Sequence, residues 1–233
     1  MSRKEDVDRL YEILNELENA VGGKRKLENC DGRMDWPRRG VYFFFDPREE
    51  RKSTDELRVT RVGTHAVSRG SETTLWDRLK THRGTLSGKY AGGGNHRGSV
   101  FRKEVGRAII AREGGEQKYP DWGEGSSAEP EVRKRELDME KEVSKHIRNL
   151  PFLWIKINDK PGAGSKRAFV ERNSIALLSN FGKEPIDPRE QAWLGNHSPK
   201  RKIRESGLWN VDYVDESYKR GFLEEMRGIV RSL

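Results

Sequence analysis

The sequence predicts an α+β protein in which a small, mostly antiparallel sheet of three strands is flanked by helices, with helical extensions at both ends. Short β-branched and aromatic runs at 40–45, 57–63 and 152–157 have the length and composition of strands. Longer segments with apolar residues at three- and four-residue steps precede, separate and follow these runs. A chain of 233 residues with such apolar runs can bury a core of its own.

An amphipathic helix is expected at the start of the chain. Ser2 and Glu5 have the spacing of a capping box, in which each side chain accepts a hydrogen bond from the other residue's backbone N–H. Apolar residues then recur at helical steps as far as Gly22-Gly23, and glycine is the residue most often found just beyond a helix end.

A β-hairpin is expected next. The first strand, 40–45, is predicted to stop at Asp46-Pro47, because proline cannot donate to a strand ladder. A charged turn over 48–56 leads to the second strand, 57–63, whose strict alternation of apolar and polar residues suits antiparallel pairing with the first.

Two helices, at about 73–82 and 99–112, are expected after the hairpin. The segment 113–129 is rich in Gly, Pro, Ser and acidic residues, which predicts a long exposed loop rather than core. A charged helix then ends at about Asn149, and the third strand, 152–157, is expected to be central in the sheet.

The last third of the chain is predicted to hold two more helices separated by a loop-rich stretch. One is capped by Ser165 and runs through Leu178, and the other carries Tyr218, Phe222 and Met226 on one apolar face near the chain end. We therefore expect a single domain with three parts: an N-terminal helical extension, 1–36, a core, 37–182, and a C-terminal extension of loop and helix, 183–233.

Composition narrows the possible partners and the compartment. Lys and Arg number 46 against 38 Asp and Glu, a formal charge of +8 that slightly favours a polyanion such as nucleic acid. The single cysteine, Cys30, excludes an internal disulfide framework and predicts a reducing, cytoplasmic location. No apolar run approaches the roughly 18 residues of a membrane span, so no membrane association is expected.

Three polar residues stand where helical periodicity asks for apolar ones. Arg78 and His82 fall on the same helix face as Leu75 and Leu79, and a guanidinium on a buried face needs an anion such as a carboxylate or a phosphate. Glu171 lies similarly on an apolar stripe and needs a cation. A purely structural alternative is that Arg78 pairs with Glu171 and that His82 is a satisfied helix-end histidine.

The glycine-rich loop 91–99 precedes a helix start and is suited to anion binding. Its backbone N–H groups can approach a phosphate closely, and Asn95, His96, Arg97 and Arg102 stand beside them as candidate nucleic-acid-binding residues. The alternative is a flexible loop with incidental basic residues, because the glycines lack the spacing of a P-loop.

A family resemblance joins these features. Gly40-Val41-Tyr42 on the first strand, Val62-Gly63 at the end of the second, Arg78 in the next helix and Glu171 in a helix after the third strand resemble the motifs of the GIY-YIG nucleases. The resemblance covers about 37–180, and the expected order β-β-α-α-β-α matches that family.

The resemblance implies hydrolysis of phosphodiester bonds in DNA with one divalent cation. It implies that Glu171 holds Mg²⁺ or Mn²⁺, that Tyr42 contacts the attacking water, and that Arg78 binds the scissile phosphate. A phenol normally keeps its proton at neutral pH, so Tyr42 needs a proton acceptor, and His82 is our candidate. The spacing Arg-x-x-x-His from Arg78 to His82 resembles restriction-enzyme members of the family.

The sequence departs from the family pattern at its second motif, where Arg61 replaces the usual tyrosine. Arginine can bind phosphate or favour the ionised form of Tyr42, but it cannot accept a proton. His65, just beyond Gly63, is a possible substitute for the missing tyrosine. The late asparagine of the family corresponds to Asn180 or to Asn173, and both remain open.

We therefore expect a free-standing, restriction-like endonuclease acting on double-stranded DNA, with homodimerisation as a way to cut both strands. The alternative is a nucleic-acid-binding regulator that keeps the nuclease fold and has lost catalysis through the change at Arg61. A nuclease of HNH type, built on Asn95-His96 or Asn196-His197, is disfavoured because no paired histidine or zinc scaffold accompanies either dipeptide.

Overall fold

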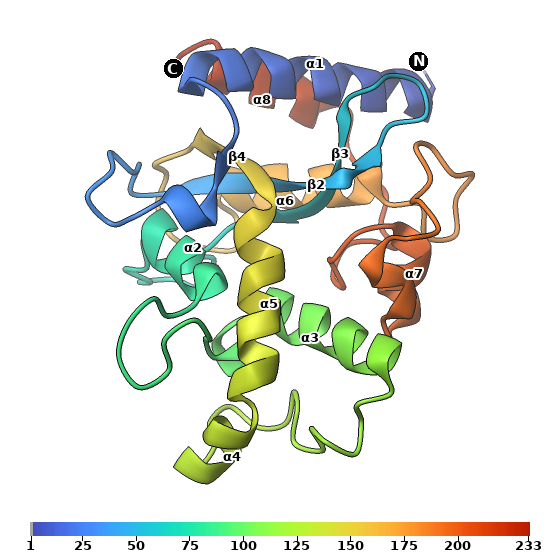
Figure 1. Ribbon diagram of the computed structural model, residues 1–233. Coiled ribbons are helices and arrows are strands. Elements are labelled where there is room, and N and C mark those ends of the chain that lie inside the picture. Colours follow the sequence, from blue (N-terminus) through green and yellow to red (C-terminus); the bar gives the residue numbers. More distant parts are fainter. Residues whose placement is uncertain (1) are drawn as a thin grey trace.

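A four-stranded antiparallel sheet lies at the centre of the protein, as the computed structural model of residues 2–233 shows (Figure 1). Its order is β1-β4-β2-β3, with β1 at Arg25–Lys26, β2 at Gly40–Glu50, β3 at Leu57–Gly63 and β4 at Pro151–Lys156. The predicted α+β class, the hairpin and the central place of the strand at 152–157 are confirmed, and the short edge strand β1 is an addition.

Helices cover both faces of this sheet. The α-helices are α1 Arg3–Val21, α2 Leu75–Arg83, α3 Val100–Glu113, α4 Pro130–Arg135, α5 Leu137–Asn149, α6 Lys166–Leu178, α7 Arg201–Ser206 and α8 Gly221–Val230. Short 3₁₀ turns are present at η1 Leu27–Asn29, η2 His96–Gly98 and η3 Leu194–His197. The expected helices are confirmed to within a few residues at their ends.

The sheet separates two hydrophobic cores. Val41, Phe43 and Phe45 of β2 point to the core formed with α1, α6 and α8, whereas Tyr42 and Phe44 point to the core formed with α2, α3 and α5. Alternation along the strand causes this division. In Figure 1, α1 and α8 lie together on one side of the sheet, and α3, α5 and α4 lie on the other.

The two ends of the chain meet over the first of these cores. The capping box of Ser2 and Glu5 is confirmed, and Gly22 ends α1 in the left-handed conformation with φ 77°. Asp6 of α1, fully buried, accepts hydrogen bonds from Tyr218 at 2.6 Å and Arg220 at 2.9 Å, which fixes α1 to the segment before α8. The division into 1–36, 37–182 and 183–233 stays a prediction.

Strand β2 continues past the expected stop at Asp46-Pro47 and ends at Glu50. Its pairing with β4 reaches only Phe44, and its pairing with β3 is irregular between Phe45 and Glu50. Pro47 therefore lies in a stretch where the regular ladder has already broken, so its missing N–H is tolerated. The prediction of a strand end at this proline was wrong for that reason.

The segment 113–129 is a loop, as predicted, but part of it belongs to the core. Tyr119 and Trp122 are 7% and 5% exposed. Trp122 stacks on His96 with ring centroids 3.9 Å apart and donates its indole N–H to the Lys103 carbonyl at 3.0 Å. The sequence did not predict this packing because two aromatic residues in a polar loop give no periodic pattern.

Two glycines allow close contacts that the hairpin requires. A Cβ atom at Gly40 would lie 2.5 Å from the carbonyl oxygen of Ile155 on β4. Gly63 lies opposite Tyr42 in the β2–β3 ladder, and a Cβ atom there would overlap the Tyr42 ring and hydroxyl. The glycines of both motifs are therefore explained by space, not by backbone conformation.

We predict that Gly63→Ala destabilises the protein by about 1–3 kcal/mol, because the added methyl group displaces Tyr42 from a packed site. The free energy of unfolding in urea measures this effect. Gly228→Ala in α8 is the control: nothing lies within 4 Å of its Cβ position, so this variant should be neutral or slightly stabilised. Equal effects of the two substitutions would contradict the explanation.

Candidate active site

Tyr42 begins a buried hydrogen-bonded chain whose middle member is His82. Its hydroxyl lies 2.8 Å from Nε2 of His82, and Nδ1 of the same ring lies 2.8 Å from the Ser99 hydroxyl. Ser99 is the N-cap of α3 and also accepts a hydrogen bond from the Arg102 backbone N–H at 3.1 Å. The order Tyr42, His82, Ser99 therefore joins β2, α2 and α3.

His82 is neutral in this environment. Burial holds its pKa well below the ordinary value, and the charges of Arg78, Arg61 and Arg102 lower it further. In the tautomer that carries its proton on Nδ1, the ring donates to Ser99 and Nε2 accepts the Tyr42 proton. Ser99 thus has the position needed to select the tautomer that accepts from Tyr42.

Arg61 and Arg78 bring two guanidinium groups to Tyr42 without carboxylate partners. Arg61 donates to the Trp209 carbonyl at 2.8 Å, and Arg78 to the Gly98 carbonyl at 3.4 Å. The Nε atom of each is buried and has no hydrogen-bond partner among the described residues. The neighbouring Tyr42 hydroxyl raises the pKa of Arg78, and burial lowers the pKa of Arg61.

Most buried arginines elsewhere in the protein are neutralised within the fold. Five form an ion pair with a carboxylate: Arg51 with Asp187, Arg58 with Glu49, Arg97 with Glu136, Arg102 with Glu140 and Arg167 with Asp159. Arg39, also buried, donates instead to the Asp159 carbonyl at 3.2 Å. Between residues 2 and 233, no such ion pair forms at Arg61 or Arg78. The site around Tyr42 therefore carries positive charge that an external anion can neutralise.

Glu171 reaches this site from the opposite layer. Helix α6 packs into the core with α1 and α8, but Glu171 lies at the end of β3, where its Oε1 accepts the Thr64 backbone N–H at 2.9 Å. Burial raises its pKa to about 7, against the opposing effects of Arg61, the Thr64 N–H and Arg78. Glu171 and Arg78 form no ion pair, so the structural alternative of an Arg78–Glu171 pair is not what the structure contains.

The C-terminal tail borders the site, which the sequence did not predict. Trp209 donates its backbone N–H to Thr60 at 2.7 Å, and the Asn210 side chain bonds both the N–H and the carbonyl of Val62, at 3.1 and 2.9 Å. The tail thus runs along β3 and brings the exposed Asp212 near Glu171, whose pKa it raises. Alternating apolar and polar residues over 209–214 are the signal that could have indicated this strand-like pairing.

The glycine-rich loop does not present its basic residues as expected. Arg102 is fully buried, paired with Glu140, and donates to the His82 carbonyl at 2.9 Å. His96 is 1% exposed, and its Nδ1 lies 2.9 Å from Glu140. These side chains hold α3 and α5 together, so neither is available to nucleic acid, and the prediction is corrected for both.

Arg97 and Asn95 are also used inside the protein. The Arg97 guanidinium is 2% exposed and bonds both carboxylate oxygens of Glu136, at 2.6 and 2.9 Å. Asn95 is exposed, but its side chain accepts the Arg97 backbone N–H at 3.2 Å. The anion cradle expected from Arg97 is therefore replaced by a charged pair that fixes the loop to the start of α5.

Of the remaining sequence-predicted residues, the two asparagines bond to the backbone, whereas both ring nitrogens of His65 are buried and have no hydrogen-bond partner among the described residues. His65 follows β3 and is 5% exposed; burial first, then Arg167, lowers its pKa to about 4. Asn173 bonds the Phe169 carbonyl at 2.7 Å and the Lys219 N–H at 2.6 Å. Asn180 bonds the backbone of Ile186 at 3.0 and 3.1 Å, so both asparagine side chains are occupied.

Comparison with known families agrees with the geometry. The sequence model of the GIY-YIG domain matches residues 1–233. This chain belongs to the GIY-YIG domain family. Members of the family are in general endonucleases that act on DNA, and this GIY-YIG domain has their nuclease-like fold. Comparison with curated proteins and with solved structures gives no match.

Two further observations bear on this GIY-YIG domain. Residues 2–233 contain no cluster of three or more His, Cys, Asp or Glu side chains arranged to hold a metal ion. In the same range, no helix is both long and apolar enough to cross a membrane.

We predict that Arg102→Ala destabilises the protein by about 3–5 kcal/mol, because it leaves Glu140 charged, buried and unpaired. Urea unfolding measures the loss. Arg112→Ala, which removes an exposed arginine of the same helix, should change stability by no more than about 0.5 kcal/mol. A small effect at Arg102 would instead favour an exposed, ligand-binding role for this side chain.

We also predict that the thermal stability gained by Glu171→Gln depends on pH. In the native protein the Glu171 carboxyl has a pKa of about 7, whereas in the unfolded chain it has the ordinary pKa of about 4.3. Between these pH values only the native state keeps the proton. Wild-type stability therefore falls as pH rises from about 4.3 to 7, and glutamine removes that loss. The difference in Tm between Glu171→Gln and wild type should increase from pH 5 to pH 8, while exposed Glu124→Gln should show a constant difference.

Proposed function

We propose that this GIY-YIG domain is a metal-dependent endonuclease that hydrolyses phosphodiester bonds in double-stranded DNA. The observation that most supports the proposal is the meeting of Tyr42, Arg78 and Glu171 at the end of β3, in a site whose arginines lack internal carboxylate partners. A phosphodiester supplies the anion that such a site needs.

Arg78 is proposed to bind the scissile phosphate. Its position on α2 places the guanidinium beside Tyr42, and its charge is retained at every accessible pH. Charge-assisted hydrogen bonds to the phosphate oxygens strengthen as negative charge builds in the transition state. Arg61, which replaces the tyrosine of the family motif, is proposed to add a second positive charge to the same side of the site.

Tyr42 is proposed to orient and deprotonate the attacking water. The phenol proton passes to Nε2 of His82, the phenolate accepts a proton from water, the water oxygen bonds to phosphorus, and the bond to the leaving oxygen breaks with protonation by solvent. A bound phosphate offsets the charges of Arg78 and Arg61 that lower the pKa of His82. DNA binding itself therefore favours the first proton transfer.

The donor set at Glu171 fits a hard divalent cation. Oε1 accepts the Thr64 N–H, and the structure gives Oε2 no partner among residues 2–233. One carboxylate with water and phosphate oxygens suits Mg²⁺ or Mn²⁺, which keep several waters when bound. Such a cation would neutralise charge on the phosphate and the leaving oxygen. Its binding requires the ionised carboxylate, and so competes with a proton whose pKa is about 7.

A restriction-like role in the cytoplasm is part of the proposal. The Arg78 and His82 spacing of restriction members supports the first part, and the single buried cysteine, Cys30, suits a reducing compartment. Cutting both strands at one site calls for two active sites, so a homodimer on DNA stays a prediction, tested by the mass of the protein alone and with a DNA duplex.

The second candidate function is a nucleic-acid-binding regulator without catalysis. Arg61 favours it, because the residue at this motif position cannot accept a proton. The two candidates differ in one observable: the regulator would retard DNA in a gel in a salt-dependent manner and leave both strands uncut.

Plasmid cleavage separates the candidates. We expect wild-type protein with Mg²⁺ or Mn²⁺ to nick or linearise supercoiled plasmid, and Tyr42→Phe, Arg78→Ala and Glu171→Ala to lose about 100- to 1000-fold in rate or more. Glu124→Ala, an exposed acidic residue, is the matched control and should cleave as wild type does. A salt-dependent gel shift with no cleavage by wild type would establish the regulator instead.

A further inference from the structure

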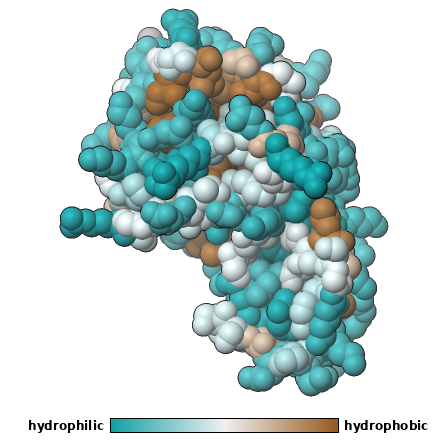
Figure 2. All heavy atoms as spheres, turned by 90° about the vertical axis from the view of Figure 1, so that its left-hand side faces the viewer, coloured by the Kyte–Doolittle hydropathy of each residue, from teal (hydrophilic) through white to brown (hydrophobic). Residues whose placement is uncertain are grey.

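A groove runs along the end of α2 beside the candidate active site. It has a volume of about 470 Å³ and lies on the α2 side of the protein, whose surface is mainly hydrophilic (Figure 2). Its lining consists of Lys80, Thr81, Arg83, Gly84, Thr85, Leu86, Ser87, Gly94, Asn95 and Gly98. Gly98 also accepts the hydrogen bond from Arg78, so the groove begins where the proposed phosphate site ends.

Side chains of α5 hold the floor of this groove in place. Arg148 donates to the carbonyl oxygens of Arg83 at 2.8 Å and Thr85 at 3.0 Å, and Ser144 donates to the carbonyl of Gly93 at 3.0 Å. The Thr85 N–H in turn bonds Gly93 at 2.8 Å, which closes the loop on itself. The groove is therefore supported from below by α5, and its form does not depend on a ligand.

Glycines keep the groove open and its backbone close to this support. Gly84 has φ 78°, and a Cβ atom there would lie 2.8 Å from the Ser144 hydroxyl. A Cβ atom at Gly94 would overlap the Arg102 guanidinium. The segment is therefore rich in glycine because side chains at these positions would collide with Ser144 and Arg102.

The lining offers cations and hydroxyl groups, which suit an anionic chain such as a sugar–phosphate backbone. Lys80 and Arg83 supply positive charge; Lys80 Nζ lies 3.5 Å from Asp77 Oδ1, and Arg83 donates to the Cys30 carbonyl at 2.5 Å. The hydroxyl groups of Thr85 and Ser87 have no hydrogen-bond partner in residues 2–233, and no carboxylate belongs to the lining. The cleft between β2 and α5 differs, because its lining combines the carboxylates of Asp46 and Glu142 with the cations of Arg48, Arg112 and Lys145.

We propose that this groove binds the sugar–phosphate backbone of the DNA strand next to the scissile phosphate. The inference rests on the proposed function, because Arg78 fixes which end of the groove faces the scissile bond. Cations, hydroxyl groups and exposed backbone are the groups that contact DNA backbones in general, and they position the strand without reading its sequence. Lys80, Arg83 and Ser87 are the residues to which we assign these contacts.

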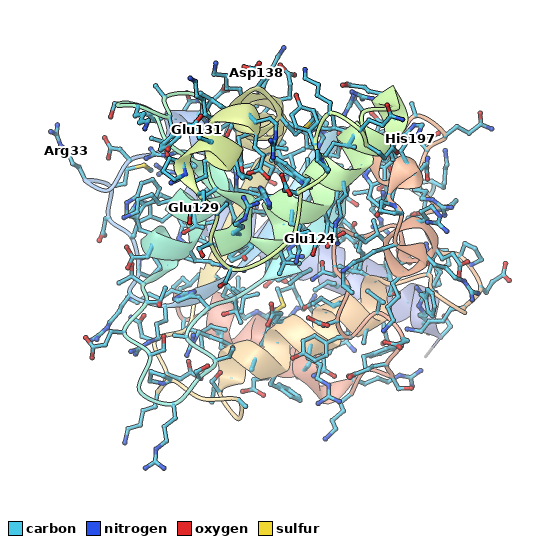
Figure 3. The ribbon with its side chains drawn as sticks, turned by 90° about the horizontal axis from the view of Figure 1, so that it is seen from below. Arg33, Glu124, Glu129, Glu131, Asp138 and His197 are labelled. Carbon is cyan, nitrogen blue, oxygen red and sulfur yellow. The ribbon has the colours of Figure 1, made fainter. Side chains whose placement is uncertain are left out.

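Thiol protection locates the DNA directly. Cys30 is 3% exposed, and burial raises its pKa to about 11, so it reacts slowly with maleimide at pH 7. Ser87→Cys places a reactive thiol in the groove, and Ser127→Cys places one in the exposed loop beside Glu124 and Glu129, just before α4 (Figure 3). With sheared plasmid DNA in EDTA, labelling of Ser87→Cys should slow about tenfold at about 90% saturation, and labelling of Ser127→Cys should not change.

Salt dependence tests the contact from Lys80. Lys80→Gln should reduce the slope of log Kd against log salt by about 1, and Lys134→Gln on α4, outside the groove, should leave the slope unchanged. The groove assignment would be overturned if DNA slowed the labelling of both introduced thiols equally or if Lys80→Gln left the slope unchanged. The absence of any DNA binding would also overturn it.

The outcomes also separate this inference from the proposed function. Plasmid cleavage by wild type without protection at position 87 would overturn the groove and leave the nuclease assignment standing. Protection at position 87 without cleavage would support the groove and count against the nuclease.

Discussion

The contact between Tyr42 and Gly63 across the β2–β3 ladder is the constraint on which the rest of the site depends. Because no side chain stands at Gly63, the Tyr42 ring can lie over the neighbouring strand and place its hydroxyl 2.8 Å from His82. That position in turn sets where α2 must lie, and α2 carries Arg78. The glycine at position 63 is therefore needed because the Tyr42 ring occupies the space that a side chain there would fill.

Electrostatics divides the arginines of this protein into two groups. Arg58, Arg97 and Arg102 are neutralised by carboxylates and hold the fold together, whereas Arg61 and Arg78 keep their charge directed at Tyr42 and Glu171. The Glu171 carboxyl belongs to α6 on the other face of the sheet, and it meets the site at the end of β3, where it accepts the Thr64 N–H. Leaving charges unpaired is unfavourable for stability, and at Arg61 and Arg78 a bound phosphate would compensate it.

Local patterns were sufficient to predict much of this arrangement. The strand runs and the spacing of Arg78 and His82 on one helix face depend on neighbours close in sequence. The roles of Arg102 and His96 could not be predicted, because their partner Glu140 lies 38 and 44 positions away on another helix. The tail along β3 was missed for the same reason: Arg61 and the carbonyl that holds it are 148 positions apart.

The most direct test of the account is a titration of the protein with Mn²⁺, followed by the loss of the free-ion electron paramagnetic resonance signal. The account predicts a single site in wild type whose affinity increases with pH up to about 7, as the carboxyl at 171 loses its proton, and the loss of that site in Glu171→Gln. Equal Mn²⁺ binding by Glu171→Gln and wild type would contradict it.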